Sequence, residues 1–177
     1  AVRSRGLGDV YKRQVLNHAG ENVFCDEGVL MSAVAGCLNS FSASTLFFAP
    51  YINSYNRFVS GAHAPTSATW GFENRTVAIR IPGGNTASTR IEHRVAGGDA
   101  NPYLLFTAIF SAALQGVKSK IKPPEPTTGN AYKKPNLSSE LLKNLPEAIE
   151  AINHLPISGF FSEVILQNLA ATKAQEF

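Results

Sequence analysis

The chain has 177 residues, 44% of them hydrophobic, and a formal net charge of +3. Its length suits a single domain, and its hydrophobic fraction suits a globular core. The positive charge comes from residues 1–14, which carry four basic residues and one acidic residue, so the remaining sequence is close to neutral. The basic balance therefore gives no support for binding to nucleic acid or to a membrane surface.

Residues 1–14 differ in character from the rest of the sequence. They resemble the translation of a transposase adapter from a sequencing library, since GAT GTG TAT AAG AGA CAG encodes Asp9 to Gln14. We leave this segment out of the fold reasoning, as is done for a fusion scar, and treat residues 15–177 as the domain. A genuine basic N-terminal arm is the alternative interpretation.

Residues 15–48 predict a hairpin end followed by a long helix. The hairpin covers residues 15–24, with its turn at 18–20. Over residues 28–48 apolar side chains recur at helical spacing, and an Ala-Pro pair then ends the pattern. Asn39 and several serines interrupt the apolar stretch before it reaches the ~18 residues of a transmembrane helix. We therefore expect no membrane segment.

Residues 58–95 predict a loop and then two strands. The loop covers residues 58–68, and residues 70–81 form a strand region with Val77, Ile79 and Ile81 on one face. A Pro-Gly-Gly turn then leads into a second strand at residues 90–95.

The remaining sequence predicts helices joined by one long loop. Asn101, followed by proline, is the expected N-cap of a helix that runs to about Lys118. This helix is apolar nearly all round, which predicts burial on all sides. A Pro-rich loop at 122–134 and two short helices, entered at Pro146 and near Phe160, complete the chain.

The strand at residues 90–95 carries the most informative pattern. Arg90, Glu92 and Arg94 point to one face of it, because a strand repeats every two residues. A carboxylate between two guanidiniums stays ionised and needs partners for its remaining lone pairs, and guanidiniums bind anions through paired hydrogen bonds. A divalent cation and a phosphate chain would satisfy all three side chains. The alternative is a solvated salt-bridge ladder. His93 lies on the opposite face, where we expect a packed, non-catalytic histidine.

Three motifs together resemble a known family. Arg-Ile-Glu-His-Arg at 90–94 is followed by Asp-Ala-Asn-Pro-Tyr at 99–103 and preceded by Asn-Ser-Tyr-Asn-Arg at 53–57. From about Val15 onward the chain resembles the glutamine synthetase superfamily of ATP-dependent carboxylate–amine ligases. The resemblance implies an α+β fold, a curved antiparallel sheet with flanking helices. In the family, an N-terminal domain, a Glu-x-Glu metal pair and a His-x-His segment would come earlier. We therefore expect residues 15–177 to be the C-terminal part of the catalytic domain, inactive alone.

The resemblance also implies roles for individual side chains. Glu92 resembles a ligand of the Mg²⁺ or Mn²⁺ ion that binds the ATP phosphates. Arg94 resembles the arginine near the glutamate carboxylate and the transferring phosphoryl group, and Arg57 resembles a second glutamate contact. The nucleotide-binding arginines around the ATP phosphates and the acyl phosphate would be Arg75, Arg80 and Arg90, with catalytic roles for Arg75 and Arg94. A structural ion pair is the alternative for each arginine, above all for Arg80 with Glu92.

The family reaction begins with phosphorylation of the γ-carboxylate of glutamate by ATP, and an amine then attacks the γ-glutamyl phosphate. His63 occupies the loop position at which glutamine synthetases have a glutamate that helps to bind ammonium. An imidazole does not reproduce the attraction of a carboxylate for ammonium. Residues 69–71 and 92–99 also look more like the γ-glutamylpolyamine synthetase branch. We therefore expect His63 to contact an organic amine or polyamine substrate.

Two alternatives stay open: a glutamine synthetase that uses ammonia, and a non-catalytic member with an assembly or regulatory role.

The resemblance implies glutamate, ATP and an amine as binding partners, and a homo-oligomer of stacked rings, since the family's active site lies between neighbouring subunits. The two cysteines, Cys25 and Cys37, lack the spacing of a metal site. Reduced thiols in a cytoplasmic protein are their simplest interpretation.

Overall fold

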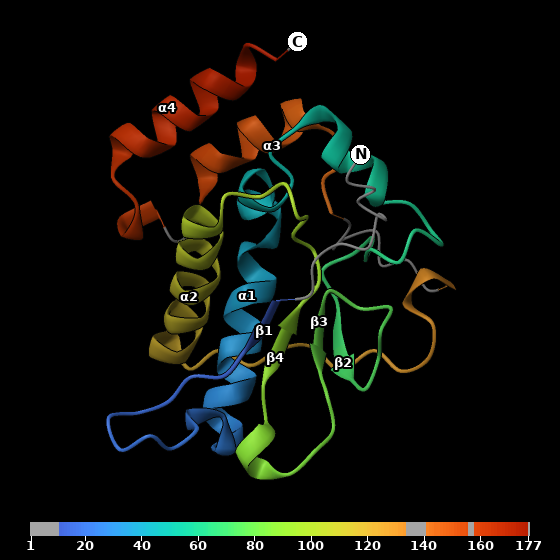
Figure 1. Ribbon diagram of the computed structural model, residues 1–177, viewed down its shortest axis with the longest axis vertical. Helices are drawn as coiled ribbons and strands as arrows, with labels where there is room; N and C mark the ends of the chain where they lie inside the picture. The colour runs from blue at the N-terminus through green and yellow to red at the C-terminus, as the bar shows by residue number, and fades with distance from the viewer. Residues whose placement is uncertain (1–10, 134–140, 156–157, 177) are drawn as a thin grey trace.

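A computed structural model describes residues 11–133, 141–155 and 158–176, and it contains a small sheet on one side of a helical layer (Figure 1). Within the described residues, the sheet has the strand order β1-β4-β3-β2. The β1–β4 and β4–β3 pairs are antiparallel and the β2–β3 pair is parallel. The strands are β1 (Tyr11–Arg13), β2 (Trp70–Phe72), β3 (Ile79–Ile81) and β4 (Ile91–His93). The α+β class is confirmed, with one parallel pairing in the sheet that was predicted to be antiparallel.

The predicted strand region at 70–81 is wrong in one respect, because the structure divides it into β2 and β3. Glu73 follows β2 with a left-handed backbone (φ 49°). The side chain of Asn74 then accepts a hydrogen bond from the backbone N–H of Thr76 at 3.0 Å. Short polar side chains that bond their own backbone in this way favour turns over strands. The Glu-Asn pair therefore ends β2 and begins a turn. After this turn, β3 pairs with β2 in parallel.

Strand β1 falls in the segment that we left out of the fold reasoning. Its backbone pairs with β4, with Lys12 opposite Glu92. A backbone ladder requires no particular side chains, so this pairing does not test the origin of residues 1–14, and the adapter interpretation stays a prediction.

The four α-helices of the described residues agree with the predicted ones within a few residues. They are α1 (Glu27–Phe48), α2 (Pro102–Ser119), α3 (Leu145–Ala151) and α4 (Glu163–Ala174). Each begins at a side chain that accepts a backbone N–H of the first turn: Asp26, Asn101, Asn144 and Ser162. The described 3₁₀ helices are η1 (Val23–Cys25), η2 (Ile52–Arg57), η3 (Thr86–Ser88), η4 (Ala131–Lys133), η6 (Ile152–His154) and η7 (Ser158–Phe160).

Helices α1 and α2 pack side by side (Figure 1), and they approach most closely at a pair of glycines. Gly36 and Gly116 face each other there, and a Cβ added at Gly116 would lie 2.1 Å from the carbonyl oxygen of Ser32. The prediction that α2 is buried on all sides is wrong. Tyr103 is 82% exposed, and Phe110 and Leu114 are also exposed. Only one side of α2 is buried, and it carries Leu105, Ala108, Ile109, Ser111, Ala112 and Gly116.

Helix α1 forms the centre of the core. By length and composition it would be long enough to cross a membrane, but 72% of its most apolar stretch is buried inside the domain. Phe41 and Phe48 of α1 pack on the ring of His93 from β4, with ring centroids 4.9 and 4.6 Å away. The helix therefore supports the back of the strand that carries Glu92.

Candidate functional site

Glu92 is a buried carboxylate in the middle of the sheet. It is 2% exposed, and Arg80 lies directly opposite it on β3 in the antiparallel register. Nη1 of Arg80 donates to Oε2 of Glu92 at 2.9 Å, and Nη2 of Arg90 lies 3.5 Å from Oε1. The alternative of a solvated ladder is therefore wrong, since this carboxylate is removed from water and paired on both oxygens.

The opposite face of β4 belongs to the core. Ile91 is buried, and His93 is 1% exposed between the two phenylalanines of α1. The prediction that His93 is packed on the face opposite Glu92 is confirmed. Both faces of this strand are thus covered, one by apolar rings and the other by ion pairs.

Arg80 joins Glu92 to a second carboxylate that the sequence did not single out. Nη2 of Arg80 lies 2.5 Å from Oε2 of Glu73, and the other oxygen of Glu73 accepts the backbone N–H of Gly83. Burial lowers the pKa of Arg80, but its bonds to Glu73 and Glu92 outweigh this and raise it overall. The bond from Arg80, and then that from Gly83, lowers the pKa of Glu73. Arg80 is therefore fixed between two acids, one buried and one exposed.

Arg94 directly follows β4 and is half-buried. Burial lowers its pKa, the charge of Glu92 raises it, and the charges of Arg80 and Arg75 lower it again. Its buried Nε has no hydrogen-bond partner in the part of the chain that the structure describes, and the same holds for Nε of Arg80. Unsatisfied guanidinium donors beside a carboxylate suit an anionic ligand, because such groups are rarely left unpaired in a folded protein.

Arg75 lies in the turn between β2 and β3 and is exposed. Its charge contributes to lowering the pKa of Glu73 and of Arg94, so it acts on the same group of charges. It also lines a groove of about 550 Å³ between this turn and residues 126–129. We use the name arginine cluster for Arg75, Arg80, Arg90 and Arg94, and the structure thus brings the cluster together with Glu92.

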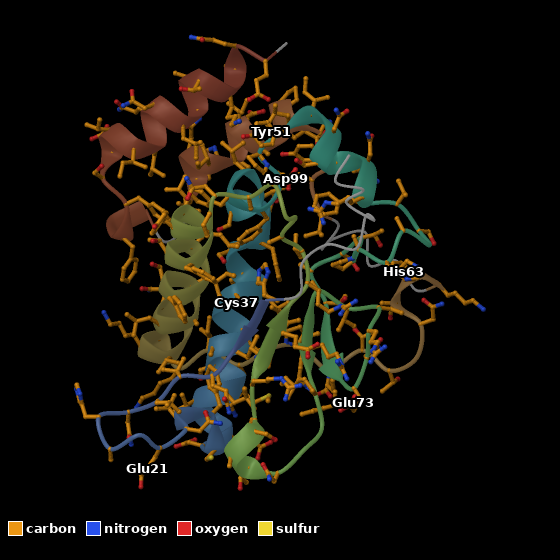
Figure 2. The ribbon with its side chains drawn as sticks, viewed as in Figure 1. Glu21, Cys37, Tyr51, His63, Glu73 and Asp99 are labelled. Carbon is orange, nitrogen blue, oxygen red and sulfur yellow. The ribbon has the colours of Figure 1, made fainter. Side chains whose placement is uncertain are left out.

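Arg57 is positioned at the far end of β4, where two of the sequence motifs meet. Its Nη2 donates to the carbonyl oxygen of Val95 at 3.0 Å, and its guanidinium lies over the ring of Phe58. Ser54 of the same motif donates to Asp99, which begins the second motif. Figure 2 shows Asp99 beside Tyr51 near the top of the view, and Glu73 lies towards the bottom. Asp99 thus links the two motifs, a role that the Asp-Ala-Asn-Pro-Tyr run could have indicated.

His63 is exposed and lies in a loop. In Figure 2 it is at the right of the view, near the segment that leads to η4. Its backbone is left-handed, with φ 64°. Across the described residues, no hydrogen bond or ion pair joins its side chain to the arginine cluster. The neighbouring Ala64 is better fixed, because its carbonyl oxygen accepts the hydroxyl of Tyr132 at 3.0 Å.

The residues around Glu92 fit one part of a divalent-cation site. Glu92 offers carboxylate oxygens, the ligand type that Mg²⁺ and Mn²⁺ prefer, in a place shielded from bulk water. Within the described ranges no group of three or more His, Cys, Asp or Glu side chains lies close enough to complete such a site. Glu92 therefore suits the role of a single protein ligand, with the other ligands supplied from outside these residues.

Replacing Glu73 by glutamine should remove a pH-dependent part of the domain's stability. The pKa of Glu73 is lowered in the folded state, so its contribution is complete above its ordinary value and is lost as the pH falls through the lowered one. The melting temperature of Glu73→Gln should therefore lie below that of wild type at pH 7, and the difference should shrink as the pH falls through the lowered pKa. Thermal unfolding monitored by circular dichroism across this range measures it.

Glu125→Gln is the matched control, because Glu125 is exposed and has no ion pair among the described residues. If the difference in melting temperature between Glu73→Gln and wild type stays constant with pH, the Glu73 carboxylate does not stabilise the domain through Arg80.

Comparison with known proteins gives a family for almost the whole chain. Residues 12–177 match the family described as glutamine synthetase, catalytic domain. The chain is 44% identical to γ-glutamylputrescine synthetase PuuA of Escherichia coli (strain K12) over 126 residues, which are 68% of this chain and 27% of that protein. It is 40% identical to type-1 glutamine synthetase 2 of Dictyostelium discoideum, over 89% of this chain and 32% of that protein.

A solved structure described as a GmaS/ADP complex has a similar fold. It superimposes with a TM-score of 0.83 and 26% identity, over 96% of this chain and 42% of that chain. The chain thus spans about a third of the length of the two curated relatives.

Proposed function

Because the chain belongs to the glutamine synthetase family, as its motifs predicted, we propose that the full-length protein is an ATP-dependent ligase. It joins the γ-carboxylate of glutamate to an amine, and an organic amine or polyamine is the preferred substrate. The observation that carries this proposal is Glu92, a buried carboxylate at 2.9 Å from Arg80 within the arginine cluster. Such an arrangement suits phosphoryl transfer, in which catalysis is mainly positioning and charge neutralisation.

Each part of the cluster has a proposed task. Glu92 would hold one divalent cation, Mg²⁺ or Mn²⁺, which when bound neutralises charge on the ATP phosphates. Arg75, Arg80 and Arg90 bind phosphate oxygens. Arg94 contacts the transferring phosphoryl group through its free Nε donor, and Arg57 binds the substrate glutamate. In the first step, an oxygen of the glutamate γ-carboxylate bonds to the γ-phosphorus of ATP and ADP leaves. The lone pair of the amine then bonds to the acyl carbon, the bond from that carbon to the phosphate oxygen breaks, phosphate leaves, and the amine nitrogen releases a proton to water.

Two lines of support favour an organic amine over ammonia. His63 occupies the loop position of an ammonium-binding glutamate, and its exposed side chain offers no carboxylate to a buried ammonium ion. One of the two curated relatives described above is named for putrescine as its amine. The other is named a glutamine synthetase, so ammonia is the competing substrate. A non-catalytic role is disfavoured, since the four arginines of the cluster and Glu92 are all present, and Arg80 and Arg90 both pair with Glu92.

The remaining proposals follow from the family. Glutamate, ATP and the amine are the partners, and the full-length protein forms a homo-oligomer of stacked rings in which neighbouring subunits complete each site. We infer a cytoplasmic location, which agrees with the free thiols of Cys25 and Cys37.

A comparison of amines tests this proposal in the full-length protein. We expect kcat/KM for putrescine or another primary amine to exceed that for ammonium at least tenfold. His63→Glu should shift the preference towards ammonium by about tenfold or more, because one carboxylate contact to a buried ammonium can contribute about 2–5 kcal/mol. The exposed His18, replaced by glutamate, is the matched control and should leave the preference unchanged. Ammonium as best substrate, with no effect of His63→Glu, would support a glutamine synthetase instead. No turnover with any amine would support a non-catalytic role.

A further inference from the structure

The loop that carries His63 requires support from outside itself. We call residues 60–66 the histidine loop. Gly61 has φ 88° and His63 has φ 64°, so the chain enters the left-handed region twice within three residues. Glycine adopts this region freely, whereas a histidine is disfavoured there and keeps the conformation only where surrounding contacts fix it. Contacts on this loop therefore decide where His63 lies.

Among the described residues, two long-range hydrogen bonds reach the histidine loop. The hydroxyl of Tyr132 donates to the carbonyl oxygen of Ala64 at 3.0 Å, and Ala64 is 1% exposed. The backbone N–H of Leu141 donates to the carbonyl oxygen of Thr66 at 3.1 Å. The first of these contacts is made by a side chain, so it can be removed by a single substitution without changing the backbone.

Tyr132 is in turn fixed to the turn that carries Arg75. Its backbone N–H donates to Oδ1 of Asn130 at 2.9 Å, and the preceding N–H of Ala131 donates to Oγ1 of Thr76 at 2.9 Å. That hydroxyl itself donates to Oδ1 of Asn74 at 2.7 Å. Both neighbours of Arg75 are thus connected to the histidine loop by hydrogen bonds and by the peptide bond between Ala131 and Tyr132.

Tyr132 also interacts electrostatically with one member of the arginine cluster. Burial raises the pKa of its hydroxyl, and the positive charge of Arg94 lowers it. In return, the charge of Tyr132 raises the pKa of Arg94. The side chain therefore bonds to the loop assigned to the amine and interacts electrostatically with the arginine assigned to the phosphoryl group.

We propose that Tyr132 is a positioning residue that fixes the histidine loop against the arginine cluster and thereby determines how tightly the amine is bound. This inference rests on the proposed ligase function. The hydroxyl of Tyr132 does not react with substrate. It acts by holding the Ala64 carbonyl, and so His63, in one place.

The first test measures the loop directly in this 177-residue chain. In Tyr132→Phe, backbone amides of residues 59–66 should exchange with deuterium about two- to tenfold faster, as expected for the loss of one hydrogen bond. Tyr103→Phe is the matched control, because Tyr103 is 82% exposed and should leave the exchange unchanged. Thr76→Val removes the acceptor for Ala131 further along the series and should give a smaller acceleration in the same residues. Unchanged exchange in Tyr132→Phe would overturn the proposal.

The second test measures amine binding in the full-length ligase. Tyr132→Phe should raise KM for the preferred amine about three- to tenfold while KM for ATP stays within twofold, a split that general destabilisation would not produce. Equal changes in both KM values, or none, in an active enzyme would overturn this proposal alone. A wild-type protein without any ligase activity would overturn the proposed function, and this inference with it, whereas the exchange experiment separately decides the Tyr132–Ala64 contact.

Discussion

Glu92→Gln should lower the turnover of the full-length ligase about a hundredfold or more, with the fold intact. The substitution keeps the size of the side chain and its hydrogen-bonding shape but removes the charge that faces Arg80 and Arg90. A fixed charge at the site of phosphoryl transfer contributes roughly 3 kcal/mol to transition-state stabilisation, which corresponds to that loss in rate. Steady-state kinetics at saturating glutamate, ATP and Mg²⁺ measures the effect.

Glu73→Gln is the matched control for this experiment. Glu73 also pairs with Arg80, at 2.5 Å, but it is exposed and lies in a turn rather than in the sheet. Its substitution should change turnover less than tenfold. Circular dichroism must show the same folded signal for both variants. Near-normal turnover of Glu92→Gln would mean that Glu92 is only an ion-pair partner of Arg80, as the sequence had left open.

The second large effect concerns the contact between α1 and α2. Gly116→Ala should lower the free energy of unfolding by about 2–4 kcal/mol, because an added Cβ would lie 2.1 Å from the backbone oxygen of Ser32 and 2.8 Å from Cα of Gly36. Backbone atoms cannot turn aside as a side chain does, so the two helices must separate. This loss would outweigh the gain of about 1 kcal/mol that alanine normally gives over glycine within a helix. Urea denaturation of the 177-residue chain measures it.

Gly159→Ala provides the comparison, because a Cβ at Gly159 meets no atom within 4 Å. It should change the free energy of unfolding by less than about 0.5 kcal/mol. If Gly116→Ala proved as mild as Gly159→Ala, the close approach of α1 and α2 would be wrong.

The helices could be predicted from the sequence because their signals are local. Asn101 with the following proline marks the start of α2, and apolar spacing marks α1, within one residue of the observed bounds. Burial was harder to predict, since Tyr103 and Phe110 are apolar enough for a core but face outward. Which side of a helix is buried depends on the elements that pack against it. Here α1 covers the side of α2 on which Gly116 allows a close approach.

The candidate site was predictable only as far as its motifs reach. The two-residue repeat of a strand predicted that Glu92 and Arg90 share one face and that His93 lies on the opposite face. The structure agrees. The partner Glu73 was missed because its contact with Arg80 depends on a turn that divides a strand expected to be continuous. Tyr132 was missed for a similar reason, because it reaches Ala64 across 68 residues of sequence through a loop without periodicity.

The pairing of Glu92 with Arg80 has a consequence for how the protein is made. A buried carboxylate left alone would oppose folding strongly, and proteins that depend on an ion to cancel such a charge stay unfolded until the ion arrives. Here the chain supplies its own counter-charge from the neighbouring strand, at 2.9 Å. The sheet can therefore form without a bound cation. When a cation binds later, Glu92 exchanges contacts with Arg80 for contacts with the ion inside a structure that is already folded.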